Sequence, residues 1–329
     1  EEMKDMNQTS VLDIVIIGFE GPQDFRIALS AILFLIFLMI LGGNSLIVVL
    51  VTISRRLHSP MYFFLCHLAI TDIIVPSNIV PNLLYVTLLD RGTISLSNCL
   101  AQFFFFGMAA NAECLILTVM SYDRFLAICR PLHYRSIMNP KVQILLATSC
   151  WFGSFTVALL FVCSTSTLKF CGSNVINHLF CDLHPLLNLS CSDTFIVDLE
   201  ILVFGNLNVV VVCVFIVTTY IWIFRTILGT SMTTGRQKAF STCTSHLTVV
   251  CTYYATLVIN YLVPLTGRST DLSKYISLLF TVITPLINPF IYTLRNREIS
   301  LVMGEMFRQL AKKYISHCHF SACLSNMFS

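Results

Sequence analysis

The amino-acid sequence predicts an all-α membrane protein, a bundle of seven transmembrane helices followed by a short amphipathic eighth helix. Of its 329 residues, 56% are hydrophobic and only 11% are charged, whereas about 25% of residues are charged in an ordinary soluble domain. The charges are placed so that seven long, nearly uncharged stretches remain between them. Because a helix needs roughly 20 apolar residues to cross the hydrocarbon core, each stretch is long enough to span a bilayer.

The seven stretches follow one another with mostly short connections. They run from residue 26 to 55, 60 to 89, 91 to 123, 141 to 169, 200 to 225, 238 to 268 and 274 to 295. The second contains Asp72 and the third contains Glu113. An unpaired carboxylate inside the bilayer costs about 2.5 kcal/mol or more, so both acids must be protonated, paired or bound to a cation. A proton relay, a channel filter, a buried sodium site and two protonated acids in helix contacts all fit this pattern.

Basic residues predict the orientation of the bundle. If the N-terminus is extracellular, 14 of the 20 Lys and Arg residues lie on the cytoplasmic side, against only three of the 17 acids. Lys and Arg resist translocation, so this arrangement is the favoured one. We therefore expect a multi-pass plasma-membrane protein with its C-terminus in the cytoplasm. The formal net charge of +3 needs no nucleic-acid partner to explain it.

The bundle is expected to have two flanking segments. Residues 1–25 form an extracellular N-terminal segment, residues 26–294 the bundle, and residues 295–329 a cytoplasmic amphipathic helix and tail. Asn7 begins a glycosylation sequon on the expected outer side. Beyond the seventh helix, apolar residues recur at helical spacing beside basic ones, which favours a helix lying on the inner leaflet. These apolar residues are Ile299, Val302, Met303, Met306, Phe307 and Leu310.

Four cysteines lie on the expected extracellular side. Cys99 is at the start of the third helix, and Cys171, Cys181 and Cys191 lie between the fourth and fifth helices. The oxidising environment there favours two disulfides, which can be connected in three ways.

The cytoplasmic ends of several helices carry polar residues. Asp123 and Arg124 end the third helix, while Tyr220 and Tyr292 lie near the inner ends of the fifth and seventh. Adjacent opposite charges are most often a solvated helix end. Here Pro285 and the Asn288-Pro289 pair also interrupt the seventh helix, where we expect a kink.

The combination resembles a known family. Residues shared with the rhodopsin-like G-protein-coupled receptors are Asn44, Asp72, Cys99, Asp123-Arg124, Trp151 and the run Asn288-Pro289-Phe290-Ile291-Tyr292. Four longer strings resemble the odorant receptors: LHSPMYFFL at 57–65, SYDRFLAICRPLHY at 121–134, KAFSTCTSH at 238–246 and PLINP at 285–289. The resemblance runs from about residue 20 to 312. Ser121, Phe125 and Ala255 depart from the family's usual Ala, Tyr and Gly, and we expect them to tune activation.

The resemblance implies specific roles. It pairs Cys99 with Cys181 and Cys171 with Cys191. It makes Asp72, Glu113 and Asn288 a structural sodium site, the only cofactor expected. It also implies a cytoplasmic G-protein switch made of Asp123, Arg124, His133, Tyr220, His246 and Tyr292.

A ligand pocket is expected within the bundle. Phe103, Phe106, Gly107, Ala110, Asn111 and Cys114 recur at three- and four-residue steps, so they share one face of the third helix. For Phe103 and Cys114, helix packing is the favoured interpretation. The resemblance implies that the pocket is lined by Phe106, Gly107, Ala110, Asn111, Phe204, Asn208, Tyr254, Leu257, Val258, Tyr261 and Thr281.

This set carries no charge, which suits a small, neutral or weakly polar ligand. The resemblance implies that this ligand is a mostly apolar, volatile odorant. Amine receptors place an acid at the position that Phe106 occupies here. A ligand of about ten heavy atoms binds with modest, micromolar affinity. The resemblance further implies a stimulatory G protein of the olfactory type as partner and a rise in cAMP.

Two other classes of protein fit the sequence less well. An enzyme has little support, because the sequence contains no phosphate-cradling glycine loop, zinc-binding His-Glu-x-x-His helix or nucleophile elbow. A transporter also needs intramembrane acids, but transporters usually show paired repeats and broken helices in corresponding halves, which this sequence lacks. A third interpretation, a receptor of the same family that is expressed outside the nose, is equally consistent with the sequence.

Overall fold

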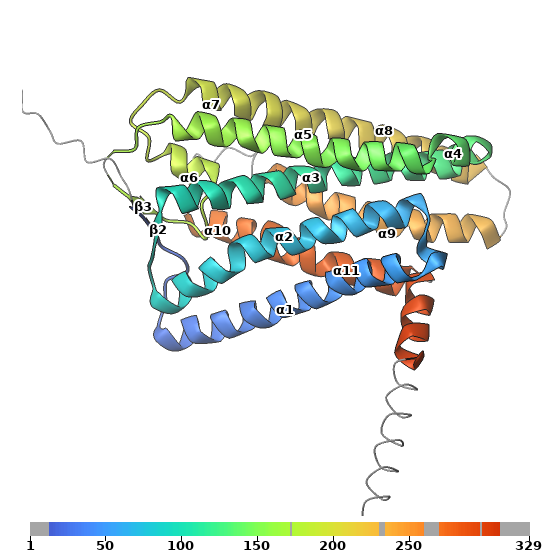
Figure 1. The fold of residues 1–329 in the computed structure, drawn as a ribbon, viewed down its shortest axis with the longest axis horizontal. Coiled ribbons are helices and arrows are strands. Elements are labelled where there is room, and N and C mark those ends of the chain that lie inside the picture. Colours follow the sequence, from blue (N-terminus) through green and yellow to red (C-terminus); the bar gives the residue numbers. More distant parts are fainter. Residues whose placement is uncertain (1–12, 172, 230–233, 260–269, 297, 310–329) are drawn as a thin grey trace, which may run out of the picture.

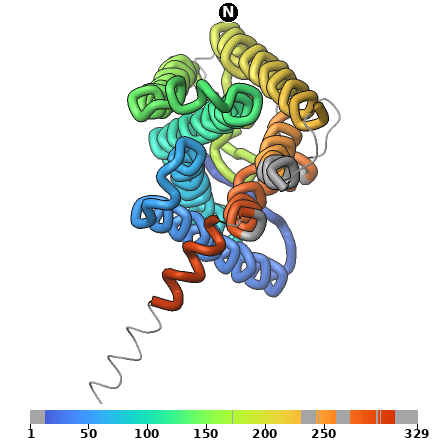
Figure 2. The backbone as a smooth tube through the Cα atoms, turned by 90° about the vertical axis from the view of Figure 1, so that its right-hand side faces the viewer, coloured from blue at the N-terminus to red at the C-terminus, as the bar shows by residue number. Residues whose placement is uncertain are grey.

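The computed structural model describes residues 13–171, 173–229, 234–259, 270–296 and 298–309. Long helices lie side by side along one axis, as Figures 1 and 2 show. The first three long helices are α1 (Gln23–Ile53), α2 (Pro60–Leu89) and α3 (Leu96–Cys129), and α5 (Pro140–Ser166) follows. The fifth membrane helix is continuous through α7 (Phe195–Glu200), the π-helical η2 (Ile201–Leu207) and α8 (Asn208–Gly229). Next come α9 (Thr234–Leu257) and a last helix made of α10 (Thr270–Leu278), η4 (Leu279–Ile283) and α11 (Thr284–Arg295).

The helices follow the predicted spans closely. The second span, 60 to 89, coincides with α2, and the first and fourth differ from α1 and α5 by a few residues. The third helix continues six residues past Asp123, to Cys129. Six helices of the described chain are long and apolar enough to cross a membrane. The helix α9 is not among them, because its N-terminal part is polar and residues 260–268, where the predicted span ends, lie outside the described residues.

Burial is reversed relative to a soluble protein. Large apolar side chains on α1 face outward, with Phe34, Leu35 and Leu38 between 48% and 60% exposed. Polar Asn44 and Asp72 are fully buried instead. This distribution suits a lipid environment, because a polar group that faced hydrocarbon would lose its hydrogen bonds.

Close packing joins the first helix to the last. The side-chain amide of Asn44 donates to the carbonyl of Pro285 at 3.1 Å and to that of Ile40 at 3.0 Å. One residue earlier, Gly43 lies so close to Pro289 that an added Cβ would be 3.1 Å from the proline ring. The absent side chain therefore allows α1 and α11 to touch.

The end of the bundle that the charge pattern predicts to be extracellular, here called the extracellular end, is capped by a small sheet and two disulfides. Strand β1 (Asp13–Ile16) lies between β2 (Gly92–Ser95), to which it is antiparallel, and β3 (Val175–Ile176), to which it is parallel. Disulfides join Cys99 to Cys181 and Cys171 to Cys191, the pairing that the resemblance implied. The ammonium of Lys274 at the top of the last helix donates to the carbonyl of Gly18 at 2.7 Å. The cap thus ties the N-terminal segment to the bundle, while Asn7 lies outside the described residues.

The opposite end, which is predicted to be cytoplasmic and is here called the cytoplasmic end, carries short connecting helices and the predicted eighth helix. The connections contain η1 (Arg55–Leu57) and α4 (Pro131–Ile137). Residues 298–309 are helical and turn away from the bundle axis at a steep angle (Figure 1). Ile299 and Val302 are buried, whereas Ser300, Glu305 and Arg308 are exposed. This helix is therefore amphipathic, as expected, and residues 310–313 of the predicted helix lie outside the described residues.

The contact at Gly43 yields a stability prediction. Gly43→Val should lower the melting temperature of the detergent-solubilised protein, because overpacking against Pro289 costs about 1–3 kcal/mol. Gly42→Val is the matched control, since a Cβ at Gly42 would meet nothing within 4 Å. Equal melting temperatures for the two variants would contradict the close approach of α1 and α11.

Candidate ligand pocket and cytoplasmic switch

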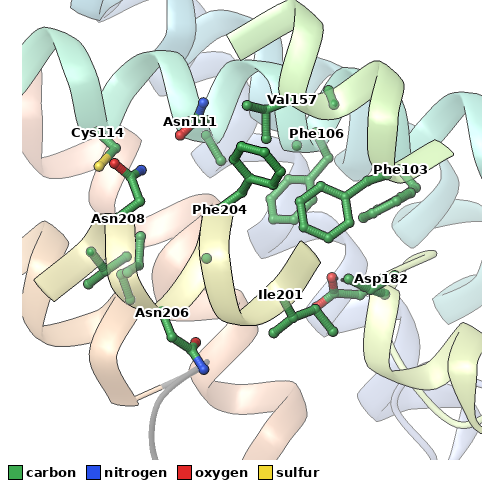
Figure 3. A pocket seen from close by; sticks show the side chains of 18 of the residues that line it. Phe103, Phe106, Asn111, Cys114, Val157, Asp182, Ile201, Phe204, Asn206 and Asn208 are labelled. Carbon is green, nitrogen blue, oxygen red and sulfur yellow. Dashed lines mark hydrogen bonds between the residues drawn. The ribbon is translucent and has the colours of Figure 1, made fainter. Parts of the chain in front are cut away.

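A cavity of about 170 Å³ lies in the extracellular half of the bundle. It is lined by α3, α5, η2, the start of α8 and the loop that contains α6 (Leu183–Leu187), as Figure 3 shows in part, together with Leu257 of α9 and Phe280 of η4. Its wall is mostly apolar and contains five phenylalanines. The phenylalanines that line it are Phe103, Phe106, Phe161, Phe204 and Phe280.

The rings of this wall support one another. The Phe106 ring lies 6.2 Å from Phe280, edge to face, and 5.0 Å from Phe180 of the extracellular loop. Phe103 meets Phe161 edge to face at 6.5 Å. Such pairs are favoured beyond the area they bury, so the wall is a rigid apolar surface.

One end of the cavity is polar. Asn111, Cys114 and Asn208 converge there (Figure 3). The Asn111 amide donates to the hydroxyl of Ser154 at 3.1 Å, and the Cys114 thiol lies 3.2 Å from the hydroxyl of Tyr254. Asn208 directly follows η2, and a π-helical turn shifts the facing of the residues after it, which is why such turns recur at functional sites.

The extracellular loop closes the cavity from above. His178 of this loop is buried, with Nδ1 3.3 Å from the carbonyl of Phe180 and Nε2 3.1 Å from the hydroxyl of Ser277. Burial lowers the pKa of the His178 imidazole. Nearby Asp182 opposes this shift in pKa, while Lys274 adds to it. A neutral imidazole therefore bridges the loop and the last helix.

Two acids are buried in the middle of the bundle. The Asn288 amide donates to both oxygens of Asp72, at 3.1 and 3.0 Å. Glu113 is 3% exposed, and its Oε1 has no hydrogen-bond partner in the described part of the chain. The described residues contain no group of three or more His, Cys, Asp or Glu side chains that could hold a metal ion.

At the cytoplasmic end, Arg124 is held by its neighbour. Its guanidinium pairs with Asp123, whose other oxygen accepts a hydrogen bond from the Tyr134 hydroxyl at 2.8 Å. A second contact joins the hydroxyl of Tyr220 to Nδ1 of His246. Tyr292, in the last turn of α11, is also buried. Its hydroxyl has no hydrogen-bond partner in the described part of the chain.

Comparison with known proteins decides the family. Residues 33–310 match the family model described as olfactory receptor. Over 318 residues the chain is 42% identical to olfactory receptor 5P76 of Mus musculus, covering 95% of this chain and 99% of that protein. Olfactory receptor 5P2 of Homo sapiens is 42% identical over 327 residues, which cover 98% of each.

The chain belongs to the olfactory receptor family. It is a G-protein-coupled receptor, a multi-pass plasma-membrane protein and not an enzyme. Squid rhodopsin shares the fold, with a TM-score of 0.68, 14% identity and coverage of 89% of this chain and 88% of that one. Membership of the family implies a small ligand and a G protein as partners.

The receptor's cavity contains seven of the eleven expected pocket residues. They are Phe106, Gly107, Ala110, Asn111, Phe204, Asn208 and Leu257. Tyr254 lies below the cavity and donates to the carbonyl of Cys114, Thr281 bonds the backbone of its own helix, and Val258 packs against the core. Tyr261 lies outside the described residues.

Several lining residues differ from the expectation. Phe103 and Cys114, for which helix packing was favoured, do line the cavity. Asp182 also lines the cavity, which corrects the expectation that the pocket residues carry no charge. Its Oδ1 accepts from the backbone N–H of Leu183 at 2.8 Å and caps α6. The only sequence signal was its position after Cys181, since the disulfide brings this loop to α3.

Most of the expected switch residues lie near Arg124, whose charge interacts with Tyr220, His246 and Tyr292. Asp123, Arg124 and Tyr134 form one cluster, and Tyr220 and His246 form a stacked, hydrogen-bonded pair. His133 is exposed on α4, away from both. Tyr134 was not among the expected residues, although it directly follows His133.

The buried imidazole yields a pH prediction. Because the folded-state pKa of His178 is below its ordinary value, its contribution to stability is complete above about pH 6.5 and is lost as the pH falls below that value. The purified receptor should therefore melt at a lower temperature at about pH 5.5 than at about pH 7.5.

His178→Gln, which cannot be protonated, should lose less melting temperature on acidification than the unaltered receptor. The control is His58→Gln, because His58 is exposed. If acidification lowered the melting temperature of His178→Gln as much as that of the unaltered receptor, protonation of this imidazole would not be the cause of the acid sensitivity.

Proposed function

We propose that this receptor binds a small, mostly apolar, volatile odorant in the cavity beside α3 and activates the olfactory stimulatory G protein, which raises cAMP. The observation that carries the proposal is the layout of α3. Gly107 and Asn111 line the cavity in the first half of this helix, and Arg124 lies in an ion pair near its other end. One rigid element thus joins a ligand site to a cytoplasmic cluster.

The ligand acts by favouring one of two states. A ligand shifts an equilibrium only through its different affinities for the two states. In the state described here, Arg124 is paired with Asp123, which also accepts a hydrogen bond from the Tyr134 hydroxyl. The Tyr220 hydroxyl is hydrogen-bonded to His246. The proposed active state has α9 moved outward, so that Arg124 and Tyr220 are released and the G protein binds between the helix ends.

A sodium ion between the buried acids belongs to the same proposal. The donor set fits a cation, because Glu113 Oε1 is unpartnered among the described residues and the Asn288 amide satisfies only Asp72. Two carboxylates in a dry interior repel each other unless a proton or a cation lies between them. When bound, sodium would supply the neutralising charge, and Asp72 and Glu113 would hold it in the inactive state.

The proposal also includes the orientation and the parts of the chain. Basic residues on the side of α4 and residues 298–309 support an extracellular N-terminus and a cytoplasmic C-terminus. We propose residues 1–25 as the outer segment, 26–294 as the bundle and 295–329 as the inner helix and tail.

The switch assignment is tested at Arg124. Arg124→Ala should remove odorant-dependent cAMP production and leave surface expression intact, since the side chain is expected to contact the G protein and not the ligand. Arg91→Ala, at an exposed extracellular position, is the control and should respond normally. A normal odorant response of Arg124→Ala would refute the switch.

The sodium assignment is tested by ion dependence. In the unaltered receptor, raising sodium at constant ionic strength should lower odorant potency, because sodium favours the inactive state. Glu113→Gln should abolish this dependence, since it removes one of the two charges. Sodium dependence that persists in Glu113→Gln, or is absent from the unaltered receptor, would leave the two acids as protonated groups in helix contacts.

A further inference from the structure

The size of the cavity restricts the ligand. A dry cavity of about 150 Å³ binds benzene in another protein, and the cavity here is about 170 Å³. It therefore accommodates a single six-membered ring with a small substituent. Gly107 contributes to this space, because a Cβ added there would meet nothing within 4 Å although the residue lines the cavity.

The wall favours an aromatic ring over an aliphatic one. Phe106, Phe204 and Phe280 come from three different membrane helices and face the same space. Aromatic rings prefer edge-to-face and offset contacts with one another, and these contacts add to the hydrophobic effect. An aromatic ligand meets such partners on several sides, whereas a saturated ring gains only burial.

The polar end selects the substituent. The Nδ2 group of Asn111 is engaged by Ser154, which leaves its carbonyl oxygen as an acceptor. Within the described chain, the side-chain amide of Asn208 makes no hydrogen bond to the protein, and it points toward Asn111 (Figure 3). A hydroxyl group both donates and accepts, so it satisfies the Asn111 oxygen and the Asn208 N–H together.

Charged ligands fit less well. The described residues that line the cavity include no Lys or Arg, so a carboxylate would lack a partner. Asp182 lies at the opposite end from the two amides (Figure 3) and already caps α6 through Oδ1. An ammonium placed there would leave the Asn208 amide unpaired, and an unsatisfied buried amide is costly.

We infer that the ligand class is a monocyclic aromatic alcohol or phenol, with its ring among Phe106, Phe204 and Phe280 and its hydroxyl between Asn111 and Asn208. The inference rests on the proposed function, since it assumes that this cavity is the odorant site. It adds the chemical group, the ring size and the orientation of the ligand.

The test is ligand binding to purified receptor in lipid nanodiscs, measured as a concentration-dependent rise in melting temperature. This readout needs no G protein, so it separates binding from signalling. The probes are para-cresol, toluene, para-methylanisole, para-methylcyclohexanol, para-methylbenzylamine, para-toluate and naphthol, together with a set of aliphatic aldehydes and alcohols.

Para-cresol should bind about tenfold more tightly than toluene or para-methylanisole, because these lack the donor and leave polar groups unpaired. It should also exceed para-methylcyclohexanol, and naphthol should bind weakly for lack of space. Asn208→Leu should reduce the para-cresol affinity to that of toluene while leaving toluene unchanged. The matched control is Asn98→Leu, because Asn98 is exposed and does not line the cavity, so the para-cresol affinity should persist.

Equal affinities for para-cresol and toluene, or an unchanged para-cresol affinity in Asn208→Leu, would overturn the inference. Tighter binding of the amine, the carboxylate or the aliphatic compounds would also overturn it, while leaving the odorant site intact. Binding of para-cresol without any rise in cAMP in cells would uphold the inference and contradict the proposed signalling. Absence of binding by every compound, at a normal melting temperature, would count against both proposals.

Discussion

The absence of water from the bilayer is the constraint on which this structure depends. A polar side chain on a membrane helix has to find its partner inside the bundle, because lipid offers none. Asn44 therefore bonds the backbone of the last helix, and Asn288 bonds Asp72. The groups that hold the helices together are consequently the groups that can change partners when the helices move, so stability and switching use the same interior contacts.

The third helix connects these contacts along its length. The cavity lies beside its extracellular half, Glu113 lies one turn below Ala109 and Ala110, and Arg124 lies at its cytoplasmic end. Tyr253 and Tyr254 of α9 donate hydrogen bonds to the backbone of α3 at Ala110 and Cys114, directly below the cavity. A ligand that displaces this part of α9 would act on the helix whose movement is proposed to expose Arg124.

Charge placement made most of the fold predictable, because a charge cannot lie far inside a span without a partner. The predicted helix boundaries were wrong where a charge does not mark the end of a helix. The third span was predicted to end at Asp123, but α3 continues to Cys129. Helical spacing identified one face of α3, yet it could not place Phe161 or Asp182, which reach the cavity through tertiary packing and a disulfide. The π-helical turn before Asn208 could not be predicted, because no residue pattern in Ile201–Leu207 distinguishes it from an α-helix.

The most direct test of this account is the distance between the cytoplasmic ends of α3 and α9, measured between two probes on unnatural amino acids in the purified receptor. The account predicts that this distance lengthens when an activating odorant and the G protein are both bound, and that the odorant alone shifts part of the population in the same direction. An unchanged distance in a receptor that is exchanging nucleotide on its G protein would contradict it.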